Sequence, residues 1–309
     1  SIGKFLRSLL STLLHYREFS TRAKIFNQFR KKYLNVSKAT FYNPNEIKGY
    51  DIYISGSDQV WNFEVTNFDD TFFLKFCSEK CKKISYAASI GRDKLSIEEK
   101  KFVKKYIDNF DYISVRESSA KKILEQLTSK PVEKVLDPTF LAENTIWDKF
   151  ISENSVKGKY IFVYSVGPIE NIMEVAEKIG KKLGLKIYYI AGKKIKSKYD
   201  HERLNKVSPQ EFLTLIKQAT FVVTNSFHGT VFSVIFNKNF ITIPHKKSGA
   251  RMIELLELLY LNNRIIKDEE EIDEDFEIQV DYRNTNYILD IEKKKSLDYL
   301  KRAIKAKIE

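Results

Sequence analysis

Strand-like and helix-like segments alternate along the chain from about residue 48. The strand-like segments are short, rich in β-branched and aromatic residues, and end near glycine or polar residues. The helix-like segments carry apolar residues at a spacing of three or four. In the first half we expect strands at 50–55, 82–89 and 111–115, helices at 96–110 and 117–127, and a closing segment at 132–138. Ser96 with Glu99 predicts a capping box at the start of the first helix.

The same alternation restarts after residue 158. The predicted strands are 159–166, 185–190, 221–225 and 239–244, and the predicted helices are 169–184, 208–219, 229–237 and 248–261. Repeated strand–helix–strand order indicates a parallel sheet with helices on both faces. We therefore predict an α/β protein with two Rossmann-like, doubly wound lobes.

The boundary between the predicted lobes falls near residues 142–158. We assign residues 1–145 to an N-terminal lobe and residues 146–285 to a C-terminal lobe. Residues 286–309 contain an amphipathic helix, which we expect to cross back to the first lobe. The acidic run at 268–277 is typical of a solvated loop or helix edge.

Composition narrows the classes of partner. The chain has 309 residues, 43% of them hydrophobic, and a net charge of +12, which is typical of a globular protein that attracts anions. A lysine-rich proteome would give the same charge. Lysine greatly outnumbers arginine, and no basic patch is interleaved with aromatic residues, so we expect no nucleic-acid partner.

Cysteine content and apolar runs bear on location. Cys77 and Cys81 are the only cysteines, which indicates a reducing compartment and no zinc site. No apolar run is long enough to span a bilayer and no signal-peptide pattern is present, so we expect a cytoplasmic protein. Residues 1–19 predict a basic amphipathic helix. Such a helix packs on its own domain or lies on the anionic inner face of a membrane.

The candidate site follows from the fold, because ligands of open α/β sheets bind beyond the carboxyl ends of the strands. Polar and charged residues stand just past those predicted ends: Ser57, Asp58, Arg116, Ser165, Asn225, Ser226, His228, His245 and Lys246.

The stretch TNSFHGTVFSVIFN at 224–237 carries the most specific of these signals. Asn225 or Ser226 can cap the following helix, and the first turn of a helix attracts anions. Gly229 removes a side chain where a ligand would approach. His228 is then a candidate general acid or base, and the alternative is a core histidine satisfied by backbone groups. The chain has four histidines, and His228 and His245 both follow neighbouring strand ends.

Arg116 and Asp58 each carry two interpretations. Arg116 follows a predicted buried strand, where a guanidinium can grip a phosphate or carboxylate, or can pair with an acid of the protein. Asp58 follows a glycine turn and is either a base or the cap of a helix leading to Trp61.

Several stretches together resemble the polysaccharide pyruvyl transferase family. They are ISGSDQVWN at 54–62, SYAASIG at 85–91, ISVRESSA at 113–120, VLDPTFL at 135–141, YSVG at 164–167 and TNSFHGTVFSVIF at 224–236. The resemblance runs from about residue 25 to about residue 260. The blocks GSDQVWN and S-x-H-G are its more specific parts.

The resemblance implies a fold similar to B-type glycosyltransferases, with an acceptor side in the N-terminal lobe and a donor side in the C-terminal lobe. It implies transfer of a pyruvyl group from phosphoenolpyruvate to two hydroxyls of a sugar in a capsule, exopolysaccharide or cell-wall polymer. The acceptor would be a saccharide or its lipid-linked precursor. The chemistry demands an acid, a base and charge stabilisation, but no metal or cofactor.

The resemblance also implies roles for single residues. His228 is the acid or base at the donor, Arg116 grips the donor's anionic groups, and Asp58 is nominated as the hydroxyl base. Around them we expect substrate contacts from Ser57, Ser165, Asn225, Ser226, Phe227, Gly229, His245, Lys246 and Arg251.

Two departures from the family pattern qualify this expectation. Many relatives have arginine two positions before the histidine, where this chain has Ser226; Lys246, Lys247 or Arg251 would substitute. Relatives usually open with a strand, a Gly-rich loop and a helix, so we expect the first β-α-β unit to be missing here.

Two other functions stay open. A nucleotide-sugar glycosyltransferase of the same architecture would need a ribose-binding carboxylate past the strands of the second lobe, and no convincing one stands there. A non-catalytic protein binding anionic glycans or membranes through its lysines would release them steeply with salt.

Overall fold

The computed structural model describes residues 19–36, 41–153, 156–167, 170–245, 249–272, 276 and 278–306. They form two compact units, each assembled from separate stretches of the chain. Unit 1 comprises the described residues within 1–40, 144–243 and 267–280, and unit 2 comprises those within 41–143, 244–266 and 281–309. The predicted amphipathic helix at 1–19 lies almost wholly outside the described residues, which begin with a helical segment at 19–33.

The division of the chain differs from the predicted linear lobes in two places. Residues 244–266 belong to unit 2 and the described residues before 41 belong to unit 1, whereas the predicted boundary after 145 lies beside the observed one at 143/144. Side-chain packing explains both differences. The Tyr33 and Phe150 rings lie 5.1 Å apart within unit 1, and Thr285 donates to the Leu259 carbonyl within unit 2.

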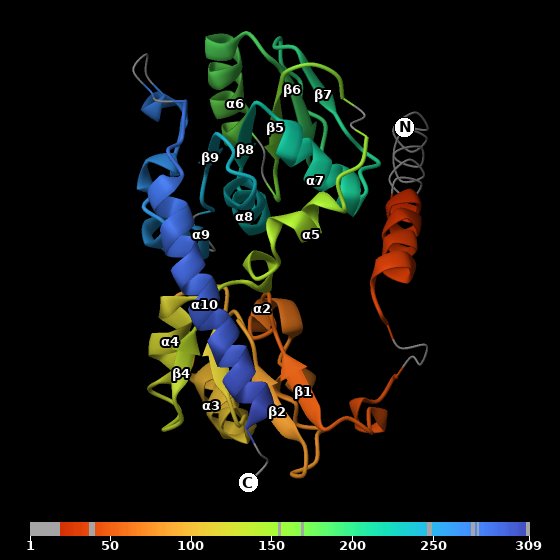
Figure 1. Cartoon of the computed structure of the whole chain (residues 1–309), viewed down its shortest axis with the longest axis vertical. Helices are drawn as coiled ribbons and strands as arrows, with labels where there is room; N and C mark the ends of the chain where they lie inside the picture. The colour runs from red at the N-terminus through yellow and green to blue at the C-terminus, as the bar shows by residue number, and fades with distance from the viewer. Residues whose placement is uncertain are drawn as a thin grey trace, which may run out of the picture. The chain divides into compact units, whose positions relative to one another are not determined.

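Unit 1 contains a five-stranded parallel sheet of order β7-β6-β5-β8-β9 (Figure 1). Its strands are β5 (Tyr160–Tyr164), β6 (Lys186–Ile190), β7 (His201–Arg203), β8 (Phe221–Thr224) and β9 (Phe240–Thr242). Its main helices are α6 (Glu170–Leu183), α7 (Pro209–Gln218) and α8 (Phe227–Ile235), and the short α5 is Asn144–Asp148. The strand order reverses between β5 and β8, which is the switch point where α/β sheets bind ligands.

The central strands of unit 1 are buried on both faces. Ile161, Phe162, Val163, Val222 and Val223 have no exposed surface. Such continuous apolar runs are typical of parallel strands covered by helices on both sides. The predicted α/β fold is therefore confirmed in this unit, with β7 as an additional edge strand.

Unit 2 contains two pairs of parallel strands, β1 (Ile52–Ser55) with β2 (Lys82–Ser85) and β3 (Ile113–Val115) with β4 (Val132–Lys134). Isolated parallel bridges from Ile84 to Tyr112 and from Ala88 to Val115 join the pairs. The helices are α2 (Phe63–Thr66), α3 (Ile97–Tyr106), α4 (Ser118–Leu124), α9 (Ala250–Leu258) and α10 (Arg283–Lys305). Ser96 and Glu99 form the predicted capping box of α3.

Two apolar clusters stabilise unit 2. One is aromatic, with Trp61 stacked on Phe73 at 5.3 Å and Phe110 edge-on to Trp61. The other packs α10, blue in Figure 1, onto β2 through Tyr299. The Tyr299 hydroxyl donates to the Ser85 carbonyl at 2.8 Å, and Ser296 Oγ accepts from the Leu136 amide at 2.9 Å. The C-terminal helix thus packs against the strands of residues 82–134.

Among the described helices, none combines the length and apolarity needed to cross a lipid bilayer.

Candidate functional site

The predicted site residues divide between the two units. Unit 2 holds Ser57, Asp58, Arg116, His245 and Arg251, and unit 1 holds Ser165, Asn225, Ser226, Phe227, His228 and Gly229. Lys246 and Lys247 lie outside the described residues. We describe the two groups separately.

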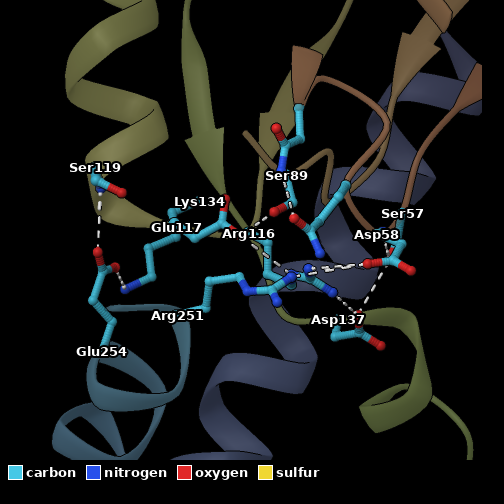
Figure 2. A network of polar contacts seen from close by, with 12 residues as sticks. Ser57, Asp58, Ser89, Arg116, Glu117, Ser119, Lys134, Asp137, Arg251 and Glu254 are labelled. Carbon is cyan, nitrogen blue, oxygen red and sulfur yellow. Dashed lines mark hydrogen bonds and ion pairs between the residues drawn. The ribbon is translucent and has the colours of Figure 1, made fainter. Parts of the chain in front are cut away.

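The centre of the unit 2 group is an ion pair between Arg116 and Asp137 (Figure 2). Arg116 directly follows β3, Asp137 lies three residues past the end of β4, and the Arg116 Nη1 to Asp137 Oδ2 distance is 2.6 Å. Their side chains are only 3% and 1% exposed. Ser57 Oγ also donates to Asp137 Oδ2, at 3.1 Å. Arg116 therefore lies at the strand end, where it could contact an anionic ligand, and it also pairs with an acid of the protein.

Asp58 faces two guanidinium groups. Its Oδ1 lies 3.6 Å from Arg116 Nη2 and 3.9 Å from Arg251 Nη1, and Arg251 comes from the first turn of α9. The Asp58 side chain is 65% exposed, whereas the arginines are largely buried. Asp58 does not cap a helix at Trp61, since α2 begins at Phe63 with Asn62 as its cap. The structure thus leaves Asp58 as the solvent-facing carboxylate of this group.

The turn before Asp58 requires glycine. Gly56 has φ of +113°, and a Cβ there would lie 2.2 Å from the Tyr86 carbonyl oxygen. Only glycine allows β1 to turn this closely over the end of β2. Asp58 itself has φ of +64°, a region that Asp tolerates better than most residues.

Glu117 and Asp137 complete the group and were not predicted as site residues. The Glu117 carboxylate is buried; it accepts from Ser89 Oγ and lies 3.4 Å from Arg116 Nε. Burial raises the Glu117 pKa above its ordinary value, and the Arg116 guanidinium acts in the opposite direction. The sequence feature that could have identified Glu117 is its position, because it follows Arg116 directly after a strand.

The two arginines also influence each other. The Arg251 pKa is lowered, first by burial and next by the positive charge of Arg116, while Glu117, Asp58 and Asp137 partly restore it. Two adjacent buried cations favour an anion that contacts both of them. The group therefore suits a phosphate or carboxylate ligand.

In unit 1 the loop after β8 is held by hydrogen bonds of Asn225 and Ser226. Ser226 is the N-cap of α8, and its Oγ accepts from the Gly229 amide at 3.4 Å. Asn225 instead accepts from the Val166 amide at 2.7 Å and donates to Ser165 Oγ at 3.2 Å. The structure thus assigns capping to Ser226 and loop positioning to Asn225.

Gly229 has a packing role. A Cβ at this residue would lie 2.3 Å from Thr224 Oγ1. Glycine therefore allows α8 to pack closely on β8. We expected it to clear space for a ligand, but Thr224 occupies the space on that side.

His228 lies in the first turn of α8 and is half-buried. Its ring is edge-on to Phe227, with centroids 5.4 Å apart. It lines a cavity of about 520 Å³ that opens beyond the carboxyl ends of β5, β6 and β7. In this position His228 can transfer a proton to or from a bound ligand, and the position fits that role better than it fits a purely structural one.

Most of the cavity lining is apolar or aromatic. The lining residues are Arg22, Phe26, Tyr164, Ser165, Val166, Gly167, Ile190, Ala191, Gly192, Leu204, Asn205, Val207, Ser208, Pro209, Phe212 and His228. All of them belong to unit 1.

The remaining candidates are less informative. His245 is exposed in unit 2, and its carbonyl accepts from the Gly249 amide at 2.8 Å. Phe227 is buried beside His228. Among the described residues no three His, Cys, Asp or Glu side chains gather as metal ligands would.

Comparison with known proteins gives one family and one fold. The profile of the family described as "Polysaccharide pyruvyl transferase" matches residues 6–247. A search of curated proteins found no match. Among solved structures, the S. aureus MnaA–UDP co-structure aligns with a TM-score of 0.53 at 14% identity, covering 84% of this chain and 76% of that one. A putative UDP-N-acetylglucosamine 2-epimerase from Listeria monocytogenes gives 0.54 at 10% identity, with the same coverage. At these identities the likeness concerns the fold, which is similar to B-type glycosyltransferases.

Proposed function

This chain belongs to the polysaccharide pyruvyl transferase family, and we propose that it transfers a pyruvyl group from phosphoenolpyruvate to two hydroxyls of one sugar. The product is a cyclic pyruvate ketal, released with inorganic phosphate. The acceptor is a saccharide of a cell-surface polymer or its precursor. We propose that the reaction takes place in the cytoplasm. If the acceptor is lipid-linked, the reaction takes place at the inner face of the membrane.

The reaction needs one proton donor and one proton acceptor. The methylene carbon of phosphoenolpyruvate gains a proton, and the first sugar hydroxyl bonds to the adjacent carbon as it loses its own proton. The second hydroxyl then displaces phosphate from that carbon, which restores a neutral ketal centre. The two hydroxyls lose two protons in total. One matches the proton that the methylene carbon gains as it becomes a methyl group, and the other leaves with phosphate.

The observation that carries the proposal is the pair of buried arginines in unit 2. Arg116 and Arg251 both approach Asp58, at 3.6 and 3.9 Å, which is looser than the 2.6 Å contact of Arg116 with Asp137. A phosphate or carboxylate forms charge-assisted hydrogen bonds with guanidinium groups readily. Phosphoenolpyruvate carries both anions on one small molecule, so it suits two adjacent guanidiniums.

His228 is the proposed acid and Asp58 the proposed hydroxyl base. An imidazole can donate the proton that the methylene carbon gains. Asp58 is the exposed carboxylate of its group, and a carboxylate can accept a hydroxyl proton as the bond to carbon forms. We propose that Lys246, Lys247 or Arg251 substitutes for the arginine that many relatives place at the position of Ser226.

The test is phosphate release from phosphoenolpyruvate, measured with a panel of saccharide acceptors. We expect acceptor-dependent release by the wild type, and a kcat lower by about 10²–10⁴-fold in His228→Ala with phosphoenolpyruvate binding retained. Arg116→Lys should instead lose the binding. Arg283→Gln, at an exposed ion pair of the same unit, is the matched control and should change neither. Wild-type activity in His228→Ala and Arg116→Lys would contradict the proposal.

A nucleotide-sugar glycosyltransferase is the competing function. The two aligned structures share its architecture, but among the described residues no carboxylate lines the unit 1 cavity to hold a ribose. Glycosyl transfer from a UDP-sugar without phosphoenolpyruvate would decide for it.

A further inference from the structure

Arg251 reaches the unit 2 group from a different kind of element than its neighbours do. Arg116 and Asp58 follow the strands β3 and β1, whereas Arg251 lies in the first turn of α9, with its Nη1 3.9 Å from Asp58 Oδ1. The separation of the two guanidiniums therefore depends on where α9 lies against the strands. An anion that contacts both arginines binds best when that helix is held in place.

Glu254, about one turn after Arg251, ties α9 to α4 (Figure 2). Its Oε2 accepts from the Ser118 amide at 2.6 Å, and its Oε1 accepts from the Ser119 amide at 3.4 Å. Ser118 and Ser119 are the first two residues of α4, and they come directly after the segment that holds Arg116. Glu254 thus joins the helix that carries one arginine to the stretch of chain that carries the other.

The start of α4 takes its cap from α9 because its own N-cap residue is engaged elsewhere. That residue is Glu117, whose side chain makes no capping hydrogen bond with the described residues. Its carboxylate accepts from Ser89 Oγ and lies beside Arg116 instead. The first amides of a helix have no partner within the helix, and the helix dipole favours a carboxylate there. Glu254 supplies that carboxylate.

Lys134 adds a third element to this contact. It is the last residue of β4, its Nζ lies 3.8 Å from Glu254 Oε2, and it donates to Ser118 Oγ at 2.8 Å. The Glu254 and Lys134 side chains are only 23% and 30% exposed, so water screens the pair in part. The same strand leads to Asp137, the buried partner of Arg116. At Glu254, α9, α4 and β4 therefore meet, and each is connected to a residue of the unit 2 group.

We infer that Glu254 is a positioning residue for anion binding, because it holds α9 where Arg251 and Arg116 can contact the same anion. It acts through Arg251, since both of its own carboxylate oxygens accept from α4 amides. That the anion is phosphoenolpyruvate rests on the proposed function, whereas the positioning of Arg251 does not. Without Glu254 both guanidiniums remain in the protein, but the second is no longer held at the distance that a shared anion requires.

The first experiment compares Glu254→Gln with Glu257→Gln in the full chain. Both substitutions remove one carboxylate from α9, and Glu257, one turn further along, is exposed. Calorimetric titration with phosphoenolpyruvate, and separately with inorganic phosphate, measures the affinity. We expect Glu254→Gln to weaken binding by about tenfold, because weaker neutral hydrogen bonds replace charge-assisted ones at α4. Glu257→Gln should change the affinity by less than about twofold.

A double-mutant cycle separates positioning from a general loss of stability. In an Arg251→Gln background, Glu254→Gln should weaken anion binding by less than about twofold, because the arginine through which it acts is absent. Equal losses of affinity in both backgrounds would overturn the inference. If Glu254→Gln folds poorly, Lys134→Met weakens the same contact from β4 and takes its place in the cycle, with the same criterion.

The two ligands and the activity assay keep this inference distinct from the proposed function. In the assay of phosphate release, Glu254→Gln should raise the KM for phosphoenolpyruvate and lower kcat far less than His228→Ala does. If inorganic phosphate binds in a way that depends on Glu254 and Arg251 but pyruvyl transfer never occurs, the proposed function fails and the inference stands. If transfer occurs and Glu254→Gln behaves like Glu257→Gln, the inference fails and the function stands. Binding of neither anion by the wild type would overturn both.

Discussion

Unit 1 and unit 2 place different chemistry at the same place in a similar sheet. In both, the candidate residues follow the carboxyl ends of parallel strands. Unit 2 fills that place with two guanidiniums and three carboxylates at close range. In unit 1 the described residues form a cavity there, lined mainly by apolar side chains and by one arginine. The fold determines where a ligand can bind, and the few residues past each strand determine which ligand that is.

The same residue type illustrates the difference. Arg116 is buried and tied to Asp137, so its charge is part of the fold as well as of the site. Arg22 makes one hydrogen bond to a backbone carbonyl among the described residues, so its charge is available to a ligand with little structural consequence. Replacing each arginine by the same neutral residue tests this contrast most directly.

Arg116→Gln should have the largest effect on stability. It removes the counter-charge of the buried Asp137, and breaking a buried ion pair in this way costs about 3–5 kcal/mol. The free energy of unfolding in urea measures it. Arg302→Gln, which breaks the exposed pair with Glu133, is the control and should cost less than about 1 kcal/mol. Similar losses in both variants would mean that the unit 2 group is not a buried network.

Gly229→Ala should cause the second largest loss of stability, and this substitution lies in unit 1. The new methyl group would collide with Thr224 Oγ1, and overpacking of this kind costs about 1–3 kcal/mol. Thermal unfolding measures it, with Gly192→Ala as control because a Cβ at Gly192 meets no atom within 4 Å. An unchanged melting temperature in Gly229→Ala would contradict the packing role.

Glu117→Gln should alter the pH dependence of stability. Because the folded-state pKa of Glu117 is raised, the folded chain holds this proton more tightly than the unfolded chain. Its stabilising contribution is therefore complete below the unfolded pKa and is lost as pH rises through the folded pKa.

The expected size of that change is about 1.4 kcal/mol for each pH unit by which the pKa is raised. Urea unfolding would be measured at several pH values from the unfolded-state pKa of Glu117 up to neutrality. Over this range the free energy of unfolding should fall less steeply with pH in Glu117→Gln than in the wild type. Parallel curves would mean that Glu117 titrates normally in the folded protein.

Arg22→Gln should have the smallest effect on stability. It removes one hydrogen bond to the Asn205 carbonyl, and such bonds contribute about 0.5–1.5 kcal/mol. Urea unfolding should show a loss at the low end of that range, far below the loss in Arg116→Gln. A loss of several kcal/mol would show that Arg22 is structural and would remove the contrast between the units.

The parallel fold was accessible from sequence because its strands are apolar throughout. The runs at 160–164 and 221–224 have the continuous burial that periodicity indicates. The strand at 201–203 was missed because His201, Glu202 and Arg203 form a polar edge strand. The grouping of residues 244–266 with unit 2 was also missed, since it depends on contacts distant in sequence that no local pattern contains.

The site was accessible only in part. Parallel topology alone places Arg116, Asp58 and His228 past strand ends. It does not say which of Asn225 and Ser226 caps the helix, nor that Asp137 pairs with Arg116, because these follow from side-chain geometry. The packing role of Gly229 could be recognised only once the position of the Thr224 side chain was known.

The C-terminal helix α10 also affects how the protein is made. The five strands of unit 1 lie between residues 160 and 242, so their sheet can be complete while later residues are still inside the ribosome. Unit 2 begins earlier in the chain, yet Ile84 and Tyr86 pack against Tyr299 and Ala303. During synthesis that apolar face stays exposed to solvent and to other chains until α10 emerges. The unit whose strands are translated first is therefore the one that finishes folding last.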